Sequence, residues 1–206
     1  TAIFYAKYDD YQINQLINLA AGTTALSIRN AAKVETYGAE LDLTYQLTEN
    51  MQINAAIGLL DAKFDKFPAG GSNGEDLSGE KLPGVSDFTV NLNIQYYYPV
   101  PVADSELSLS LNYNYQDDYN TDLDGQTSTT LANGQTLAIG HVDGFGIFNA
   151  AINLEPLDNG LSLHFWVRNI ADEDSPIILG EKSFFGTRRN VYVNPRTYGL
   201  TAKYSF

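Results

Sequence analysis

The sequence predicts an all-β protein, an antiparallel transmembrane β-barrel that crosses the membrane with its strands. Apolar and polar residues alternate with a period of two over segments of about ten residues, the length of a strand that crosses a bilayer at barrel tilt. The polar members are mostly Asn, Gln, Ser and Thr, whereas the exterior of a soluble protein usually carries more Lys and Glu. The connections alternate between long and short, as expected for a barrel with loops at one end and tight turns at the other.

The alternation predicts eight strands. The first is the least regular, and Ala2, Phe4, Ala6 and Tyr8 form its more apolar row. The predicted strands, in chain order, comprise residues 1–16, 26–47, 51–64, 87–98, 107–117, 142–154, 161–170 and 194–206.

The later strands show the alternation more clearly. In "YGAELDLTYQL", "MQINAAIGL" and "FTVNLNIQY" every second residue is apolar or aromatic. "LSLSLNYNYQ" sets three Leu and two Tyr against Ser and Asn, and "FNAAINL" follows the same rule. In "LSLHFWVR", Trp166 is the exception, because it falls on the polar row. "TYGLTAKYSF" alternates up to the final residue, Phe206.

The connections predict the orientation of the strands. Residues 48–50, 99–106 and 155–160 form short turns rich in Pro, Asp, Asn and Gly. Long polar segments cover residues 65–86, 118–141 and 171–193, with a shorter one near 17–25. By the usual barrel arrangement, the long segments lie outside the cell and the short turns lie in the periplasm.

Composition excludes some classes of function. Net charge is −13, which argues against nucleic-acid binding because that requires a basic surface. The chain has no cysteine, which suits an oxidising compartment. No apolar stretch approaches the roughly 18 residues that a membrane-spanning helix needs.

A soluble antiparallel barrel or sandwich with one buried face is the alternative fold, since alternation alone is compatible with it. Two further features favour the membrane. The chain stops in mid-strand on an apolar residue, whereas soluble domains usually end in a polar tail. Aromatic rings, which suit the membrane–water interface, gather near the strand ends. They are Tyr96, Tyr97, Tyr98, Tyr113, Tyr115, Tyr204 and Phe206.

Five stretches, in order, resemble TonB-dependent outer-membrane receptors over essentially the whole chain. "FYAKYDDYQ" is similar to one of their strands, and "NAAKVETYGAELDLTYQLTENMQINAAIGLLDAKFDKF" to a hairpin with Gly38-Ala39-Glu40 in a Gly-x-Glu position. "GEKLPGVSDFTVNLNIQY" is similar to a Pro-containing loop exit and strand, and "WVRNIADEDSPI" to an Asn-aliphatic-x-Asp strand end. "NPRTYGLTAKYSF" is similar to their closing strand.

The resemblance implies a fold and a function. The family barrel has 22 strands around an N-terminal plug, so residues 1–206 would be its last eight strands, with the plug and TonB-contacting segment absent. Such receptors take up a scarce solute with energy supplied through TonB. A ferric siderophore is the expected solute, with cobalamin, haem and carbohydrates as rivals. The implied partners are outer-membrane lipid and lipopolysaccharide, the outer-membrane assembly machinery, the TonB complex and a small-molecule ligand.

The closing strand carries a second implication of the resemblance. In the family, a C-terminal strand ending in Phe is the signal that the assembly machinery reads. The expected signal residues are Tyr198, Leu200, Tyr204 and Phe206. A simpler role for Phe206 is that of an interfacial anchor, and the two roles are compatible.

Candidate ligand contacts lie in the last long loop and on the polar rows. Arg188 and Arg189 near Phe184 and Phe185 suit an anionic ligand such as a ferric chelate. They suit lipid phosphates equally well, and a solvated loop tip explains them as readily. The polar rows are expected to face the lumen, where hydration of the wall is the default role. These residues are Glu40, Asp42, Asn91, Asn93, Asn112, Asn114, His164 and Arg168.

Neither catalysis nor a cofactor is expected. His141 and Asp143 share a strand face but are too few for a metal site. Asn120, Asp122 and Asp124 match the start of a calcium loop, yet the twelfth position is Leu131 instead of Glu, which favours a solvated acidic loop.

Two functions stay open. The first is the barrel wall of a transport receptor. The second is a complete small eight-stranded barrel with a structural or adhesive role, whose interior would be filled by side chains.

Overall fold

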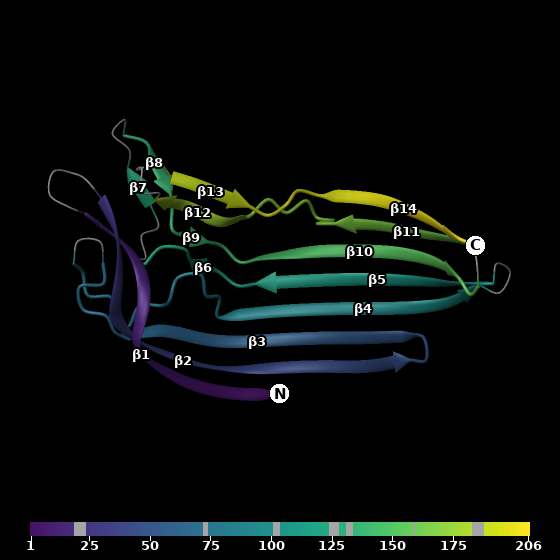
Figure 1. Cartoon of the computed structure of the whole chain (residues 1–206), viewed down its shortest axis with the longest axis horizontal. Coiled ribbons are helices and arrows are strands. Elements are labelled where there is room, and N and C mark those ends of the chain that lie inside the picture. The colour runs from purple at the N-terminus through teal and green to yellow at the C-terminus, as the bar shows by residue number, and fades with distance from the viewer. Residues whose placement is uncertain are drawn as a thin grey trace.

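Eight long antiparallel strands form one sheet in the computed structural model (Figure 1). The structure describes residues 1–18, 24–71, 74–100, 104–123, 128–130, 134–158, 160–182 and 188–206. The sheet strands are β1 (Ala2–Asn18), β2 (Thr24–Thr48), β3 (Met51–Lys66), β4 (Phe88–Val100), β5 (Ser105–Gln116), β10 (Phe145–Pro156), β11 (Gly160–Arg168) and β14 (Thr197–Ser205). The eight strands expected from the sequence are confirmed. Within the described ranges no helix is long and apolar enough to cross a membrane.

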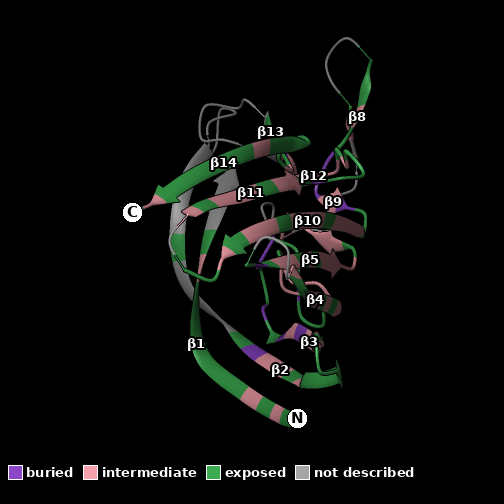
Figure 2. Cartoon of the chain, turned by 90° about the vertical axis from the view of Figure 1, so that its right-hand side faces the viewer, coloured by how far each residue is buried: buried purple, intermediate pink, exposed green. Residues whose placement is uncertain are grey.

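The strand order is sequential, because each strand pairs with the next long strand in the chain. The order is β1-β2-β3-β4-β5-β10-β11-β14. Viewed along the strands, the sheet follows an arc with β1 at one edge and β14 at the other (Figure 2). The sheet is therefore an open part of a barrel wall.

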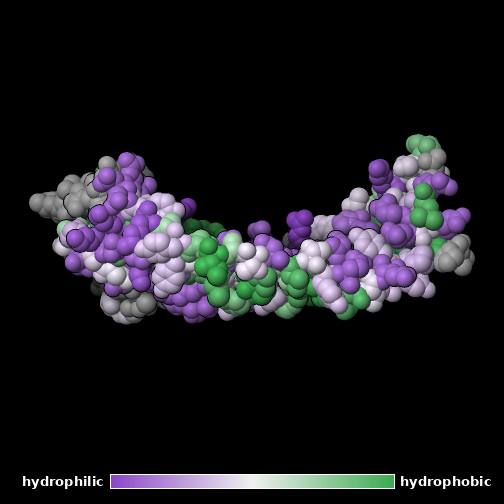
Figure 3. Space-filling model, turned by 90° about the horizontal axis from the view of Figure 1, so that it is seen from below, coloured by the Kyte–Doolittle hydropathy of each residue, from purple (hydrophilic) through white to green (hydrophobic). Residues whose placement is uncertain are grey.

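The register separates a polar face from an apolar face. Glu40 lies opposite Gly58, Asn91 opposite Asn114, and Asn153 opposite His164. Partners in a ladder point to the same side of a sheet, so these pairs define the polar face. The apolar face carries large exposed side chains, and they form a band over the middle of the strands (Figure 3). They include Leu41, Leu43, Leu59, Leu109, Leu111, Phe148, Ile152, Phe165 and Leu200.

Strand β1 differs from the other strands in the direction of its more apolar row. Ala2 pairs with Glu40 and Phe4 pairs with Gly38, so the more apolar row of this strand lies on the polar face. The Phe4 ring fills the space that a side chain at Gly38 would need. Ile3 and Tyr5 take the apolar face instead.

In the described residues, the long polar segments contain three short hairpins. These are β6 (Tyr119–Asn120) with β9 (His141–Val142), β7 (Ser128–Thr130) with β8 (Thr136–Ala138), and β12 (Pro176–Lys182) with β13 (Arg188–Tyr192). Ile139 and Val142 are fully buried among them. The short strands satisfy backbone groups that burial would otherwise leave unpaired.

The main apolar core of the described residues lies at the loop end of the sheet. Val34, Phe64, Phe67 and Leu77 are buried together, and the rings of Phe64 and Phe67 lie 4.8 Å apart. The loop after β3 folds back along that strand, since the amide of Leu82 donates to Ala62 O at 2.9 Å. This loop is therefore a packed part of the fold.

Candidate functional site

The eight residues expected to face the lumen share the polar face of the sheet. Cross-strand pairing links Asn91 to Asn114 and Asn93 to Asn112, and the row continues to Asn149 of β10. Glu40 and Asp42 join this face through β3, and His164 and Arg168 join it through β11. The polar row is therefore continuous from β2 to β11.

A cavity of about 770 Å³ lies between this face and the base of the β12–β13 hairpin. Its wall includes Asn91 of β4 and Asn114 of β5. The hairpin contributes Ile177 and the segment after it contributes Val193 to the lining of the cavity. Neither residue was expected from the sequence, because the 171–193 segment was read as a polar loop.

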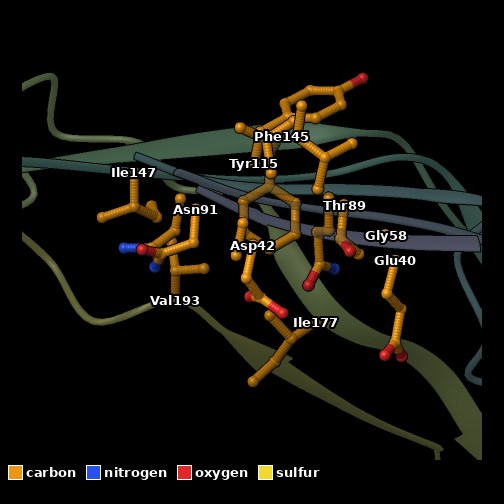
Figure 4. Close-up of a pocket in the computed structure, with 15 residues that line it drawn as sticks. Glu40, Asp42, Gly58, Thr89, Asn91, Tyr115, Phe145, Ile147, Ile177 and Val193 are labelled. Carbon is orange, nitrogen blue, oxygen red and sulfur yellow. The ribbon is translucent and has the colours of Figure 1, made fainter. Parts of the chain in front are cut away.

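Two carboxylates dominate the charge of this cavity. Glu40 and Asp42, two residues apart on β2, both line it, and Figure 4 shows their carboxylates pointing the same way. No ion pair holds either carboxylate within the described part of the chain, and both are exposed. The cavity can therefore accept cationic or hydrogen-bond-donating groups.

Asparagine side chains form a ladder of hydrogen bonds across the polar face. The amide of Asn91 donates to Asn114, and that of Asn114 donates to Asn112. Asn149 Nδ2 also donates to Asn112 Oδ1 at 3.1 Å. The amide N–H of Asn169 then donates to Asn149 Oδ1 at 3.0 Å. The ladder holds the side chains in fixed orientations across β4, β5 and β10.

A second, smaller hollow of about 250 Å³ lies farther along the same face, over β5, β10 and β11. His164, Trp166 and Arg168 line it. The Arg168 guanidinium lies over the Trp166 ring at 5.0 Å, and His164 Nδ1 hydrogen-bonds to Asn153. The exceptional position of Trp166 is explained by Gly199 on β14, because the indole covers that glycine.

The "WVRNIADEDSPI" and "NPRTYGLTAKYSF" stretches meet at the loop end of β11 and β14. Arg196 Nη1 donates to Ile170 O at 3.1 Å, and Arg196 Nη2 pairs with Asp172 Oδ2 at 3.2 Å. Asn169 is buried, and its Nδ2 donates to Glu173 O at 2.8 Å and Asn194 O at 2.9 Å. We call Asn169, Asp172 and Arg196 the loop clamp, because they fix both ends of the 171–193 loop.

The predicted ligand residues are only partly described. Phe184 and Phe185 lie outside the described residues. Arg188 and Arg189 belong to β13, and Arg189 is exposed. Arg189 is not among the described residues that line the large cavity, whose hairpin contacts come from the base.

The acidic loop shows no metal cluster within the described ranges. Asn120 Oδ1 contacts His141 Nδ1 at 3.0 Å, and His141 Nε2 lies 3.6 Å from Asp143 Oδ1. Asp124 and Leu131, which the comparison with a calcium loop also involves, lie outside the described residues.

Three of the four residues expected to form the assembly signal lie on one side of β14, and Phe206 directly follows the strand. Tyr198, Leu200 and Tyr204 are exposed on the apolar face, and Phe206 is 98% exposed at the turn end. The rings of Tyr204 and Phe206 meet edge to face at 5.2 Å.

Three comparisons extend this description to known proteins. The chain matches a family model described as "TonB dependent receptor-like, beta-barrel" over residues 1–170. No curated protein matches it significantly in sequence. Of the solved structures, the ferric yersiniabactin uptake receptor FyuA from Yersinia pestis aligns with a TM-score of 0.71 and 14% identity, over 99% of this chain and 27% of its own.

Two further receptors align similarly. BauA, the ferric preacinetobactin receptor from Acinetobacter baumannii, has a TM-score of 0.65 and 16% identity over 99% of this chain and 26% of its own. The ferripyoverdine receptor of the outer membrane of Pseudomonas aeruginosa has a TM-score of 0.65 and 14% identity, over 99% of this chain and 24% of its own. The chain thus spans about a quarter of each receptor, and identities this low show the fold alone. Because the family model matches most of the chain, the chain belongs to the TonB-dependent receptor β-barrels, a family of outer-membrane transport receptors.

Proposed function

We propose that this chain is the C-terminal part of the barrel wall of an outer-membrane receptor that takes up a ferric siderophore or a similar chelate, energised through TonB. The polar face would line the lumen and the apolar face would contact lipid. The observation that carries the proposal is the sheet itself, which aligns over 99% of its length with receptors for ferric yersiniabactin and ferric preacinetobactin.

The chemistry of the two faces supports this assignment. Backbone groups in hydrocarbon must be paired, and a strand ladder with an apolar exterior satisfies that requirement. The polar face offers amide ladders and carboxylates to water, to a plug or to a passing solute. In this assignment the loop end faces the outside of the cell and the turn end faces the periplasm.

The alternative of a complete eight-stranded barrel requires β1 to pair with β14. Those strands occupy opposite edges of the sheet, with no pairing between them in the part of the chain that the structure describes. The large cavity on the polar face also differs from the filled interior of a small barrel.

Uptake by the full-length receptor tests the proposal. Cells that express the receptor, and cells that also lack TonB, would be given radioactive iron as ferric yersiniabactin, preacinetobactin or pyoverdine. Accumulation of at least one chelate that depends on both the receptor and TonB is expected. If uptake of every chelate were equal with and without the receptor, the proposal of siderophore transport would be wrong.

A further inference from the structure

The large cavity on the polar face has an acidic end and an apolar end. Two neighbouring cross-strand rows run along its wall, and partners within a row point to the same side of the sheet. One row leads from Glu40 on β2 to Phe145 on β10, and the next leads from Asp42 to Ile147. All four residues line the cavity (Figure 4). Both rows therefore begin with a carboxylate and end with a large apolar side chain.

Small neighbours leave both carboxylates open to the cavity. Glu40 lies opposite Gly58 and Asp42 lies opposite Ala56 on β3. On its other side, Glu40 has Ala2 of β1 as its partner. None of these neighbours has a side chain that covers a carboxylate or donates a hydrogen bond to it. Both carboxylates are therefore accessible to a ligand in the cavity.

The described lining of this cavity contains no Lys, Arg or His. Neither carboxylate forms an ion pair within the described ranges of the chain. An anion bound here would be repelled by two negative charges, whereas a cation would be attracted by both. The cavity therefore favours a positively charged ligand, in contrast to the anionic ligand expected at Arg188 and Arg189.

The remaining wall favours an apolar body of limited size. Ile177 and Val193 add apolar surface to that of Phe145 and Ile147. The Tyr119 hydroxyl donates to Ile177 O at 2.8 Å, which fixes this part of the wall. From β2 to β10 the rows cross four strand spacings, roughly 19 Å along the sheet. The volume of about 770 Å³ is that of a typical small-molecule site, so a ligand with its charge at one end can occupy the whole cavity.

An organic ammonium group fits the acidic end better than a bare metal ion. Hard divalent cations prefer six or more oxygen ligands, and the described residues contain no cluster of three or more side chains suited to a metal ion. An ammonium group has three hydrogen-bond donors. Two carboxylates that lie two residues apart on one face of a strand can share these donors.

We propose that this cavity binds a ferric chelate that carries a primary ammonium group, held jointly by Glu40 and Asp42. This inference rests on the proposed function, because it names the charge class of the chelate that the receptor takes up. The ammonium group donates hydrogen bonds to both carboxylates. The apolar part of the chelate lies against Phe145 and Ile147 at the other end of the two rows.

Binding to the purified full-length receptor in detergent tests the site. The probes are the iron complexes of a hydroxamate and of a catecholate, each with a free primary amine and as its N-acetyl derivative. An ion pair with one exposed carboxylate contributes up to about fivefold in affinity, so acetylation should weaken binding of the preferred chelate about tenfold. Titration calorimetry measures each dissociation constant.

Variants of the two carboxylates locate the preference for the amine. Glu40→Gln and Asp42→Asn should each weaken binding of the amine chelate about threefold to fivefold, and the double variant should bind both forms equally. Affinity for the acetylated form should stay at the wild-type value in all three, which also controls for misfolding. Glu106→Gln is the matched control, because Glu106 lies on the polar row of β5 but is not among the described lining residues. It should leave both affinities unchanged.

The outcomes separate this inference from the proposed function. Equal affinity of the wild-type receptor for the amine and acetylated chelates would overturn the inference and leave a receptor for ferric chelates. Equal loss of both forms in the double variant would assign the carboxylates to contacts within the receptor, and would also overturn it. Failure to bind either iron complex in any form would contradict both proposals.

Discussion

At the scale of single residues, the neighbours across strands explain what the sequence pattern could not. Trp166 breaks the alternation of its strand, yet its indole covers Gly199 of β14. The apolar row of β1 lies on the polar face for a related reason, because the Phe4 ring fills the space above Gly38. Both pairs join residues more than 30 positions apart in the sequence, so only the register reveals them.

Gly199 should be intolerant of larger residues because the indole occupies its side-chain position. A Cβ there would lie 2.6 Å from Trp166 Cζ2. Gly199→Val should destabilise the barrel by about 1–3 kcal/mol through overpacking. Urea unfolding of the full-length receptor in detergent measures this cost. In a Trp166→Ala background the cost should shrink, and an unchanged cost there would contradict the contact.

Asn169 should be required for the fixed base of the last loop. Its φ of 51° lies in the left-handed region that asparagine tolerates better than most residues, and its buried amide donates to two carbonyls. Asn169→Ala should cost about 1–3 kcal/mol, because both carbonyls lose a buried partner.

Limited proteolysis of intact cells measures the state of the loop. Cleavage within residues 171–193 should increase several-fold in Asn169→Ala, and Asn169→Gly should give the same result because it restores the conformation without the amide. Cleavage at the wild-type rate would show that the loop clamp does not restrain the loop.

At the scale of elements, period-two patterns predicted all eight long strands. They did not predict the buried core at the loop end or the short hairpins in the loops. Strand patterns are readable because each strand has one apolar row, as in the Leu and Tyr row of β5. The buried residues Val34, Phe64, Phe67 and Leu77 are spread over strands and a loop with no shared period. The three hairpins of the described residues were not predicted, because each of their strands has only two to seven residues and so shows little alternation.

The two faces of β5 should respond oppositely to charge. Leu111 lies on the apolar face and Asn112 on the polar face. Leu111→Arg should cost about 2–4 kcal/mol near the middle of the bilayer, whereas Asn112→Arg should cost much less. Unfolding titrations in lipid vesicles would measure both. Equal costs would mean that the faces are wrongly assigned.

At the scale of the whole molecule, loop lengths predicted which end faces out. All long connections leave one end of the sheet and all short turns the other (Figure 1). An epitope inserted after Gly74 should be labelled on intact cells, and one inserted after Asp158 should be labelled only after permeabilisation. Labelling of the Asp158 site alone would invert the topology.

The candidate site was predictable only in part at this scale. The polar rows followed from alternation, because a residue on the polar face differs from its neighbours in polarity. The cavity did not, since Ile177 and Val193 come from a segment that reads as a loop. Its shape depends on where the base of the β12–β13 hairpin lies relative to the sheet, which no local pattern encodes.

Phe206 should matter more for assembly than for stability. It lies at the turn end of the edge strand, fully exposed and far from the loop end. Phe206→Asp should cost only about 0–1 kcal/mol of folded stability at the membrane interface. If the assembly machinery reads this aromatic ring, the amount of assembled receptor should fall much further than that cost explains.

Immunoblots of outer-membrane fractions, beside ligand binding per assembled receptor, measure the two effects separately. Phe206→Tyr, which keeps the ring, is the matched control. Wild-type levels of Phe206→Asp would leave Phe206 as an interfacial anchor only.

The open edges of the arc make this sheet a natural fragment for building a split receptor. β1 and β14 each present one side of their backbone without a partner within the described sheet, and hydrocarbon penalises such groups by several kcal/mol apiece. Edges of this kind act as templates for complementary strands. If this segment and the remaining strands of the barrel are supplied as separate chains, they should therefore assemble into a complete receptor. Strand pairing at the free edges of β1 and β14 would drive that assembly.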